Sequence, residues 1–163
     1  MTRPPAVPVL RTVRAEDGPF LHRLFVSIRG PEFAATDLAP AALSSLLAMQ
    51  RDAQDDSYRR EHPGADVDLI IIDSQPAGRL TVDREPGRIH VVEIGLLPEY
   101  RGRGTGTWLL TRLLEEGQRS GRSVTLNVVR TGRALVLYRR LGFVITGGDD
   151  VYLEMATAPG PVS

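Results

Sequence analysis

Three strands in direct succession, separated by turn signals, constrain the fold of this chain most. VDLIIIDS (67–74) predicts a buried strand, and a hairpin turn at Gln75–Gly78 leads into RLTVDRE (79–85). Pro86-Gly87 then turns the chain into a third strand, RIHVVEIGLL (88–97). Helical patterns lie on both sides of this meander in a chain of 163 residues, which predicts a single α/β domain with a mixed sheet.

The other elements follow from apolar periodicity and from Gly, Pro and Asp stop signals. The expected order is β-α-α-β-β-β-α-β-α-β-β, in one domain of residues 1–163 whose ends, 1–6 and 157–163, are expected to be frayed. Outside the meander we expect a strand at 7–14, helices at 17–30 and 40–62, a helix from after Gly102 to about Ser120, a strand at 123–129, a helix at 133–141, and two strands around the turn Gly147-Gly148-Asp149-Asp150.

Composition removes several kinds of chemistry. The twenty basic residues are all Arg, so neither a Schiff-base lysine nor a Walker phosphate loop can form. The chain has no Cys, which excludes a disulfide framework, a thiolate nucleophile and a thiolate zinc site. The apolar runs are far shorter than a membrane span, and MTRPPAVPVL lacks the apolar core of a signal peptide, so we expect a cytoplasmic protein.

Charge is distributed unevenly although the formal net charge is zero. From Arg101 to Ile145 the chain carries nine Arg and two acidic residues, whereas 46–73 is acidic. This asymmetry indicates an anionic ligand and gives no sign of nucleic-acid binding. The acidic residues Asp52, Asp55, Asp56 and Asp66 could attract a cationic amine, but a solvated helix face is the favoured interpretation.

PEYRGRGTG, residues 98–106, lies between the third strand of the meander and the next helix. Its glycines let the backbone approach a ligand, the first-turn N–H groups have no helical acceptors, and two arginines add positive charge, which together favour a phosphate or pyrophosphate site. The Rossmann fingerprint fails because Thr107 occupies its third glycine position, and a Walker loop needs a lysine. The alternative is a glycine-rich connection with solvated arginines.

A second motif, about thirty residues later, is RALVLYRRLGF, which places Tyr138 on the face of a short helix that points to the sheet. Arg101-x-x-Gly104-x-Gly106 followed by this A-x-x-x-Y-x-x-L-G-F pattern closely resembles the GNAT superfamily of acyl-CoA-dependent N-acyltransferases. The resemblance covers roughly Val67 to Met155 and implies the GNAT fold, in which the fourth strand bulges and splays from the fifth.

The resemblance also implies acetyl-CoA as co-substrate and no metal. The backbone of 94–96 would pair with the pantetheine, the amides of 101–107 would hold the pyrophosphate, and Arg139 or Arg140 could reach a phosphate. Thr131 replaces an Asn that is frequent in the family, and its hydroxyl could cap the helix or bind pantetheine. The implied cofactor-binding residues are Ile94, Gly95, Leu96, Arg101, Gly102, Arg103, Gly104, Thr105, Gly106, Thr107, Thr131 and Tyr138.

The implied reaction is the transfer of an acetyl group to a primary amine, of a small molecule or a peptide, by direct attack in a ternary complex. Tyr138 would protonate the departing thiolate, since a phenol is a suitable acid near neutral pH. The base that takes the amine proton stays open among His90, Glu93 and a water relay. Glu93 is expected to be buried within VVEIGLL, which would make it a better proton acceptor. His22 and His62 are expected to be surface residues.

Two other functional classes stay open. A non-catalytic acyl-CoA-binding sensor or interaction domain would keep the cofactor site without turnover, and the retention of Tyr138 argues against it. A nucleotide-binding module is disfavoured by the failed glycine fingerprint and the absent lysine. The sequence names no acceptor, and pairing of the last strands in a homodimer, which many relatives show, is compatible with it.

Overall fold

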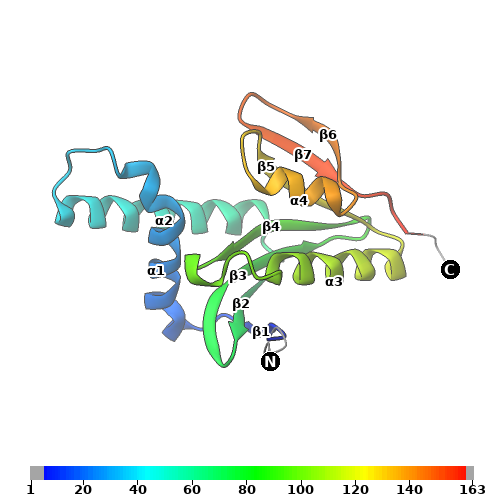
Figure 1. Cartoon of the computed structure of the whole chain (residues 1–163), viewed down its shortest axis with the longest axis horizontal. Coiled ribbons are helices and arrows are strands. Elements are labelled where there is room, and N and C mark those ends of the chain that lie inside the picture. Colours follow the sequence, from blue (N-terminus) through cyan, green and yellow to red (C-terminus); the bar gives the residue numbers. More distant parts are fainter. Residues whose placement is uncertain (1–5, 161–163) are drawn as a thin grey trace. The chain divides into compact units, whose positions relative to one another are not determined.

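Residues 6–160 are described here from a computed structural model of the chain (Figure 1). The order of elements is the one expected from the sequence, with three short 3-10 helices added. In chain order the elements are β1 (Val9–Thr12), η1 (Ala15–Asp17), α1 (Gly18–Arg29), η2 (Gly30–Phe33), α2 (Pro40–Glu61), β2 (Asp66–Ile72), β3 (Gln75–Arg84), β4 (Arg88–Leu96), η3 (Pro98–Tyr100), α3 (Thr105–Ser120), β5 (Ser123–Val129), α4 (Ala134–Arg140), β6 (Val144–Gly148) and β7 (Tyr152–Ala156).

The strands form a seven-stranded mixed sheet in the order β1-β2-β3-β4-β5-β7-β6. β4 and β5 pair in parallel, from Arg88↔Ser123 to Val91↔Leu126, whereas β5–β7, β6–β7 and β1–β2 are antiparallel. The parallel pair requires a crossover, and α3 supplies it. The predicted α/β fold with a mixed sheet is therefore confirmed.

The hairpin between β2 and β3 turns earlier than the sequence predicted. Asp73 and Ser74 have φ values of 50° and 65°, whereas Gln75–Gly78, the predicted turn, already belongs to β3. Two successive positive φ values are typical of the two-residue type I′ turn, whose twist matches that of paired strands. The Gln-Pro-Ala-Gly composition suggested a turn, but the strand pairing overrides that local preference.

β4 contains one extra residue relative to β3, as two hydrogen bonds between these strands show. Near the turn, the Glu85 N–H donates to the Arg88 carbonyl at 2.9 Å, and at the other end the Leu97 N–H donates to the Ala77 carbonyl at 2.8 Å. Eight steps on β3 thus oppose nine on β4. The difference is a β-bulge between Arg88 and Leu97, which confirms the bulge expected in this strand.

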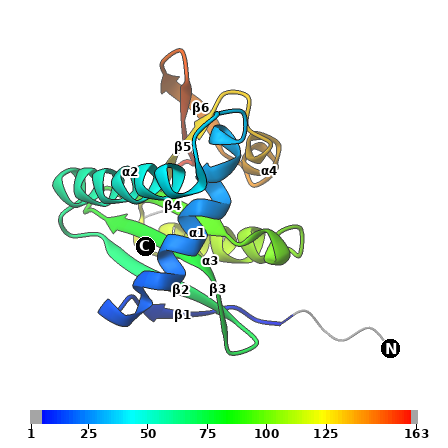
Figure 2. The ribbon, with the colours of Figure 1, turned by 90° about the vertical axis from the view of Figure 1, so that its left-hand side faces the viewer.

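The described chain forms two compact units, the first of residues 6–80 and 94–103 and the second of residues 81–93 and 104–160. In the first unit α1 packs against α2, and the two helices cross (Figure 2). Their buried side chains are apolar: Leu21, Leu24, Phe25 and Leu47. That 1–163 is a single domain stays a prediction.

In the second unit α3 and α4 both pack on β5. Alternate residues of β5 are buried, as expected for a strand with one apolar and one polar face: Val124, Leu126 and Val128. The chain after β7 was expected to be frayed, but Thr157 still donates its N–H to the Val124 carbonyl at 2.9 Å. Residues 1–5 and 161–163 of the predicted frayed ends lie outside the described residues.

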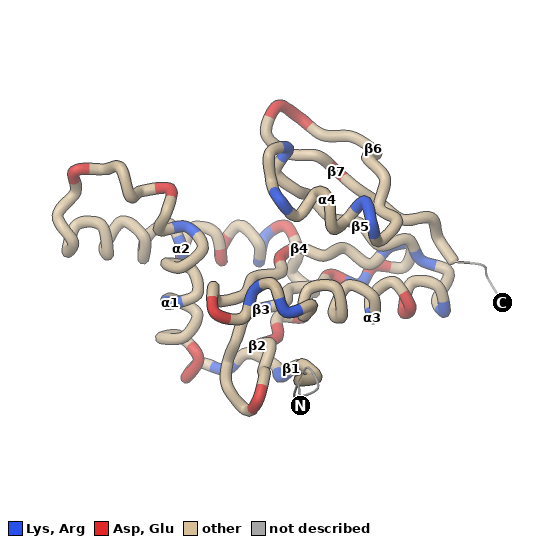
Figure 3. The backbone as a smooth tube through the Cα atoms, viewed as in Figure 1, with Lys and Arg blue, Asp and Glu red and all other residues tan. Residues whose placement is uncertain are grey.

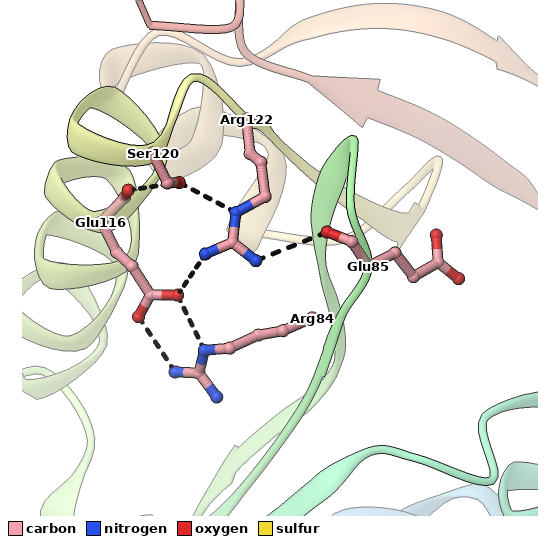
Figure 4. A network of polar contacts seen from close by, with 5 residues as sticks. All are labelled: Arg84, Glu85, Glu116, Ser120 and Arg122. Atoms are coloured by element: carbon pink, nitrogen blue, oxygen red, sulfur yellow. Dashed lines mark hydrogen bonds and ion pairs between the residues drawn. The ribbon is translucent and has the colours of Figure 1, made fainter. Parts of the chain in front are cut away.

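A polar network fastens the C-terminal half of α3 within this second unit (Figure 4). The Glu116 carboxylate accepts two hydrogen bonds from the Arg84 guanidinium, at 2.7 and 3.1 Å, and one from Arg122 at 3.4 Å. Arg122 also bonds Ser120 Oγ at 2.8 Å and the Glu85 carbonyl at 3.4 Å. The Arg84 hydrogen bond is the main reason that the pKa of Glu116 is lowered. The network links α3 to the β3–β4 hairpin.

Candidate active site

The first turn of α3 has no cap of its own. Gly104 is the N-cap residue, with φ at 82°, and it has no side chain to accept hydrogen bonds from the first-turn amides. Gly102 also has positive φ, at 73°. The first turn carries no acidic side chain, and Figure 3 shows basic positions in the segment just before it. Uncapped N–H groups at the positive end of a helix dipole favour an anion at this position.

Gly106, the second residue of α3, is required neither by packing nor by backbone conformation. Among residues 6–160, a Cβ atom added there would meet no other heavy atom within 4 Å, and its φ lies outside the positive range. Glycine in a helix is less favourable than Ala by up to about 1 kcal/mol. The protein alone gives no reason for this residue, whereas a ligand close to the backbone would.

The C-terminal part of β4 turns its main-chain groups to alternate edges. The Gly95 carbonyl oxygen lies against Gly78 of β3, and the Leu97 N–H also points to β3. The Leu96 carbonyl, between them, accepts a hydrogen bond from the Arg101 Nε at 3.0 Å. Consecutive carbonyls of a strand point to opposite sides, so the Leu96 carbonyl is turned away from β3.

The two loop arginines contact protein groups of the first unit. Arg101 bonds the Leu96 carbonyl, and the Arg103 guanidinium lies 5.8 Å from the centroid of the Tyr100 ring, a cation–π contact. Both arginines are exposed. Their expected role as phosphate partners stays a prediction, and the Leu96 contact occupies only the Nε of Arg101, so its other N–H groups could still donate to a ligand.

Tyr138 lies on the buried face of α4, with 9% of its surface exposed. Its ring meets Phe143 edge to face, with centroids 5.9 Å apart. Within residues 6–160 its hydroxyl has no hydrogen-bond partner, and burial raises the pKa of the phenol above its ordinary value. The hydroxyl therefore keeps its proton at neutral pH and can donate it.

His90 lies in β4, inside the second unit, and is 7% exposed. Its Nδ1 is 2.7 Å from Oγ1 of Thr125, the residue beside it on β5. Glu93 is half-buried, less enclosed than the sequence suggested, and it lies in the part of β4 that contains the bulge. Both remain candidates for the base.

A family model described as an acetyltransferase (GNAT) domain matches residues 65–145, the segment that contains the meander, the α3 start and Tyr138. The chain belongs to the GNAT family. An uncharacterized N-acetyltransferase of Methanocaldococcus jannaschii is 34% identical over 98 residues, which are 58% of this chain and 41% of that protein. The chain thus spans less than half the length of that relative.

Solved structures share the fold over nearly the whole chain. PaiA N-acetyltransferase from Thermoplasma acidophilum, in complex with coenzyme A, superposes with a TM-score of 0.64 at 16% identity, covering 93% of this chain and 98% of that one. An acetyltransferase from Thermus thermophilus gives 0.66 at 21% identity, with 93% and 97% covered. The ribosomal L7/L12 alpha-N-protein acetyltransferase RimL, in complex with coenzyme A, gives 0.65 at 18% identity, with 94% of each chain covered. At these identities the likeness establishes the GNAT fold.

Other residues of this GNAT chain that the sequence singled out lie on the surface. Arg139 and Arg140 are exposed on α4. Thr131 is exposed too, and it does not cap α4, whose N-cap residue is Arg133. The capping role considered for Thr131 is therefore wrong. A contact of Thr131 with pantetheine stays a prediction.

The acidic helix face is only partly solvated, which corrects one expectation. Asp52 and Asp56 are exposed, but Asp55 is half-buried and bonds Arg79 of β3 at 3.3 Å. Arg79 has 7% of its surface exposed. An arginine next to the apolar residues in the middle of β3 was the sequence signal for a buried ion pair, because a buried guanidinium needs a carboxylate.

The described part of the chain offers neither a metal cluster nor a membrane-spanning helix. Within residues 6–160 no group of three His, Cys, Asp or Glu side chains is placed to hold a metal ion. His22 and His62 are half-buried and belong to no such group. Among the same residues, no helix combines the length and the apolar character that crossing a membrane demands.

Proposed function

We propose that this GNAT chain is an N-acetyltransferase that transfers the acetyl group of acetyl-CoA to a primary amine. The observation that carries the proposal is the start of α3, where an uncapped first turn is combined with a glycine, Gly106, that nothing in the protein requires. A pyrophosphate would accept hydrogen bonds from the uncapped N–H groups of this turn, and the space it occupies would explain why residue 106 has no side chain. CoA is the pyrophosphate ligand of two structures that share this fold.

Acetyl-CoA would contact three parts of the chain. Amides of 101–107 would hold the pyrophosphate, and the backbone of Ile94–Leu96 would pair with the pantetheine amides as an added strand. The Leu96 carbonyl supports this role because it is turned away from β3. Thr131 and Tyr138 would contact the pantetheine end and the thioester. Each of these contacts is a proposal taken from the family resemblance.

The chemistry is the aminolysis of a thioester. The nitrogen of the neutral amine forms a bond to the acetyl carbon, the C–S bond breaks, and the sulfur leaves as a thiolate. Tyr138 would give its proton to that sulfur, and its raised pKa keeps the proton available until then. The base that takes the amine proton is His90, Glu93 or water. The oxyanion would be stabilised by backbone N–H groups of the bulged β4.

The acceptor is proposed only as a class, a primary amine of a small molecule or a peptide. The structural relatives leave this open, since RimL is described as an alpha-N-protein acetyltransferase and others carry no acceptor in their description. Similarity below 25% identity transfers none of these acceptors to this chain.

Two measurements test the proposal. Acetyl-CoA should raise the melting temperature, while NAD and ATP should not. Release of free thiol from acetyl-CoA should then depend on one of a panel of amines, amino acids, aminoglycosides and peptides. A shift without thiol release from any amine would favour the binding-only sensor. Stabilisation by NAD or ATP alone would overturn the assignment.

Tyr138→Phe should lower kcat on the order of 10²-fold, because general acid catalysis contributes at least this much, while the Kd for acetyl-CoA changes little. Steady-state thiol release and a thermal-shift titration measure the two quantities. Tyr152→Phe is the matched control, since Tyr152 lies on β7 with half of its surface exposed. Equal turnover in Tyr138→Phe and the control would leave Tyr138 with a packing role only.

A further inference from the structure

A row of three polar residues crosses adjacent strands of the second unit. Thr125 of β5 is the register partner of His90 on β4. On the other side of His90 lies β3, where the Glu85–Arg88 hydrogen bond closes a two-residue turn. The register of β4 with β5 is regular from Arg88 to Val91, so the β-bulge lies beyond this stretch, and counting two residues back along β3 and two forward along β4 places Asp83 across from His90. The row Asp83–His90–Thr125 therefore lies on one face of the sheet.

The side chains of this row are largely buried. Asp83 is 9% exposed and His90 is 7% exposed, and Thr125 is half-buried. The residues of β5 that flank Thr125, Val124 and Leu126, are buried on the opposite face. Buried polar side chains in such a place are retained only with hydrogen-bond partners, and Thr125 supplies one to His90 at 2.7 Å.

The residue types on either side of His90 differ in what they can do. A hydroxyl can donate to Nδ1 or accept from it, whereas a carboxylate can only accept. The hydrogen bond at one ring nitrogen decides the role of the other. A carboxylate opposite the ring favours a proton on Nε2, which leaves the Nδ1 lone pair to accept from the Thr125 hydroxyl.

We propose that Asp83, His90 and Thr125 form a proton relay for the acetyl transfer, with Thr125 as the group that meets the acceptor amine. The amine nitrogen loses a proton to Thr125 Oγ1 as the hydroxyl passes its own proton to His90 Nδ1. The ring becomes an imidazolium opposite the Asp83 carboxylate, which stabilises the charge. The inference rests on the proposed acetyltransferase function, and it selects His90, acting through Thr125, from the open candidates for the base.

A neighbouring charge, Arg88, is held mainly by another group, although the Asp83 carboxylate also acts on it electrostatically. Arg88, two positions before His90 on the same face, is bonded to Glu85 at 2.5 Å. Ser123, two positions before Thr125, is the register partner of Arg88. Ser123 therefore shares the face and strand of Thr125 without adjoining His90, and Ser123→Ala is a matched control.

The first arm of the test reads the tautomer of His90 without any turnover. The chain has three histidines, so a two-bond ¹H–¹⁵N spectrum of the imidazoles is simple, and His90→Gln assigns the signal. At about pH 8, where an ordinary imidazole is neutral, wild type should carry its proton on Nε2. Thr125→Val and Asp83→Asn should shift the ring nitrogens toward a tautomer mixture, whereas Thr125→Ser and Ser123→Ala should match wild type.

The second arm measures acetyl transfer to the best amine of the panel. Thr125→Val should lower kcat about 10- to 100-fold with little change in the KM for acetyl-CoA, since a misplaced reacting group costs this much. Thr125→Ser should restore most of the loss, because it keeps the hydroxyl. A wild-type ring protonated on Nδ1, or an unchanged kcat in Thr125→Val, overturns the relay. Absence of transfer by wild type would instead refute the proposed function, and the spectra would still test the row.

Discussion

Gly78 in β3 and Gly106 in α3 are both glycines inside regular elements, but for different reasons. A Cβ atom at Gly78 would overlap the Gly95 carbonyl oxygen, so the two strands require the missing side chain. A Cβ atom at Gly106 would meet nothing within 4 Å in the part of the chain that the structure describes. The packing of the two strands therefore requires a glycine at position 78, whereas the packing of the described residues does not require one at position 106.

The largest effect is expected at the structural position. Gly78→Ala should lower the free energy of unfolding by about 3 kcal/mol or more, because the overlapping atom belongs to the backbone and cannot rotate away. Urea unfolding measures the loss. Gly87→Ala, in the β3–β4 turn, is the control, since its added Cβ meets nothing within 4 Å. Equal stability of the two variants would contradict the close approach of Gly78 and Gly95.

An intermediate effect is expected at Gly104, which has open space but a φ of 82°. Gly104→Ala should cost about 1–2 kcal/mol of stability, since a side chain in the left-handed region is strained. Gly104→Asn should recover part of the loss, because Asn tolerates this region better. Thermal or urea unfolding of the two variants compares them directly. A fully stable Gly104→Ala would mean that the loop before α3 adopts another conformation.

The smallest effect on stability, and the sharpest contrast, is expected at Gly106. Gly106→Ala should leave the free energy of unfolding unchanged or raise it by up to about 1 kcal/mol, because Ala favours the helix. The same change should raise the Kd for acetyl-CoA about tenfold, which corresponds to about 1.4 kcal/mol, because the added methyl group would occupy space that the pyrophosphate needs. Calorimetric titration measures it. Wild-type affinity in this variant would remove the main support for the cofactor site.

The sequence predicted the order of elements and the two motif positions because these depend on local patterns. The apolar alternation of β5 and the glycine at the start of α3 specify their structures within a few residues. The turn at Asp73-Ser74 was misplaced because two chemically ordinary residues adopt positive φ under the demands of strand pairing. Judged by local composition alone, the Gln-Pro-Ala-Gly segment was a better candidate for the turn than Asp73-Ser74.

Contacts between distant segments were beyond the reach of sequence reasoning. Asp55 and Arg79 are 24 residues apart, and nothing in the helical pattern around Asp55 indicated a partner on β3. Thr125 was overlooked for the same reason, since its link to His90 spans 35 residues. The alternation of Ser123, Thr125 and Asn127 on β5 was the available signal. This alternation indicates that one face of β5 is polar, but it does not identify the side chain on the neighbouring strand that each polar residue contacts.

The first turn of α3 also contains its own optical reporter. Trp108, the only tryptophan in the chain, follows the Gly104–Thr107 segment, and the Arg112 guanidinium lies 4.8 Å from the centroid of its ring. A dianionic ligand at the helix start would change the electric field at this indole, and with it the fluorescence emission. Cofactor binding to the unlabelled protein should therefore be visible in a simple emission titration, before any acceptor is known.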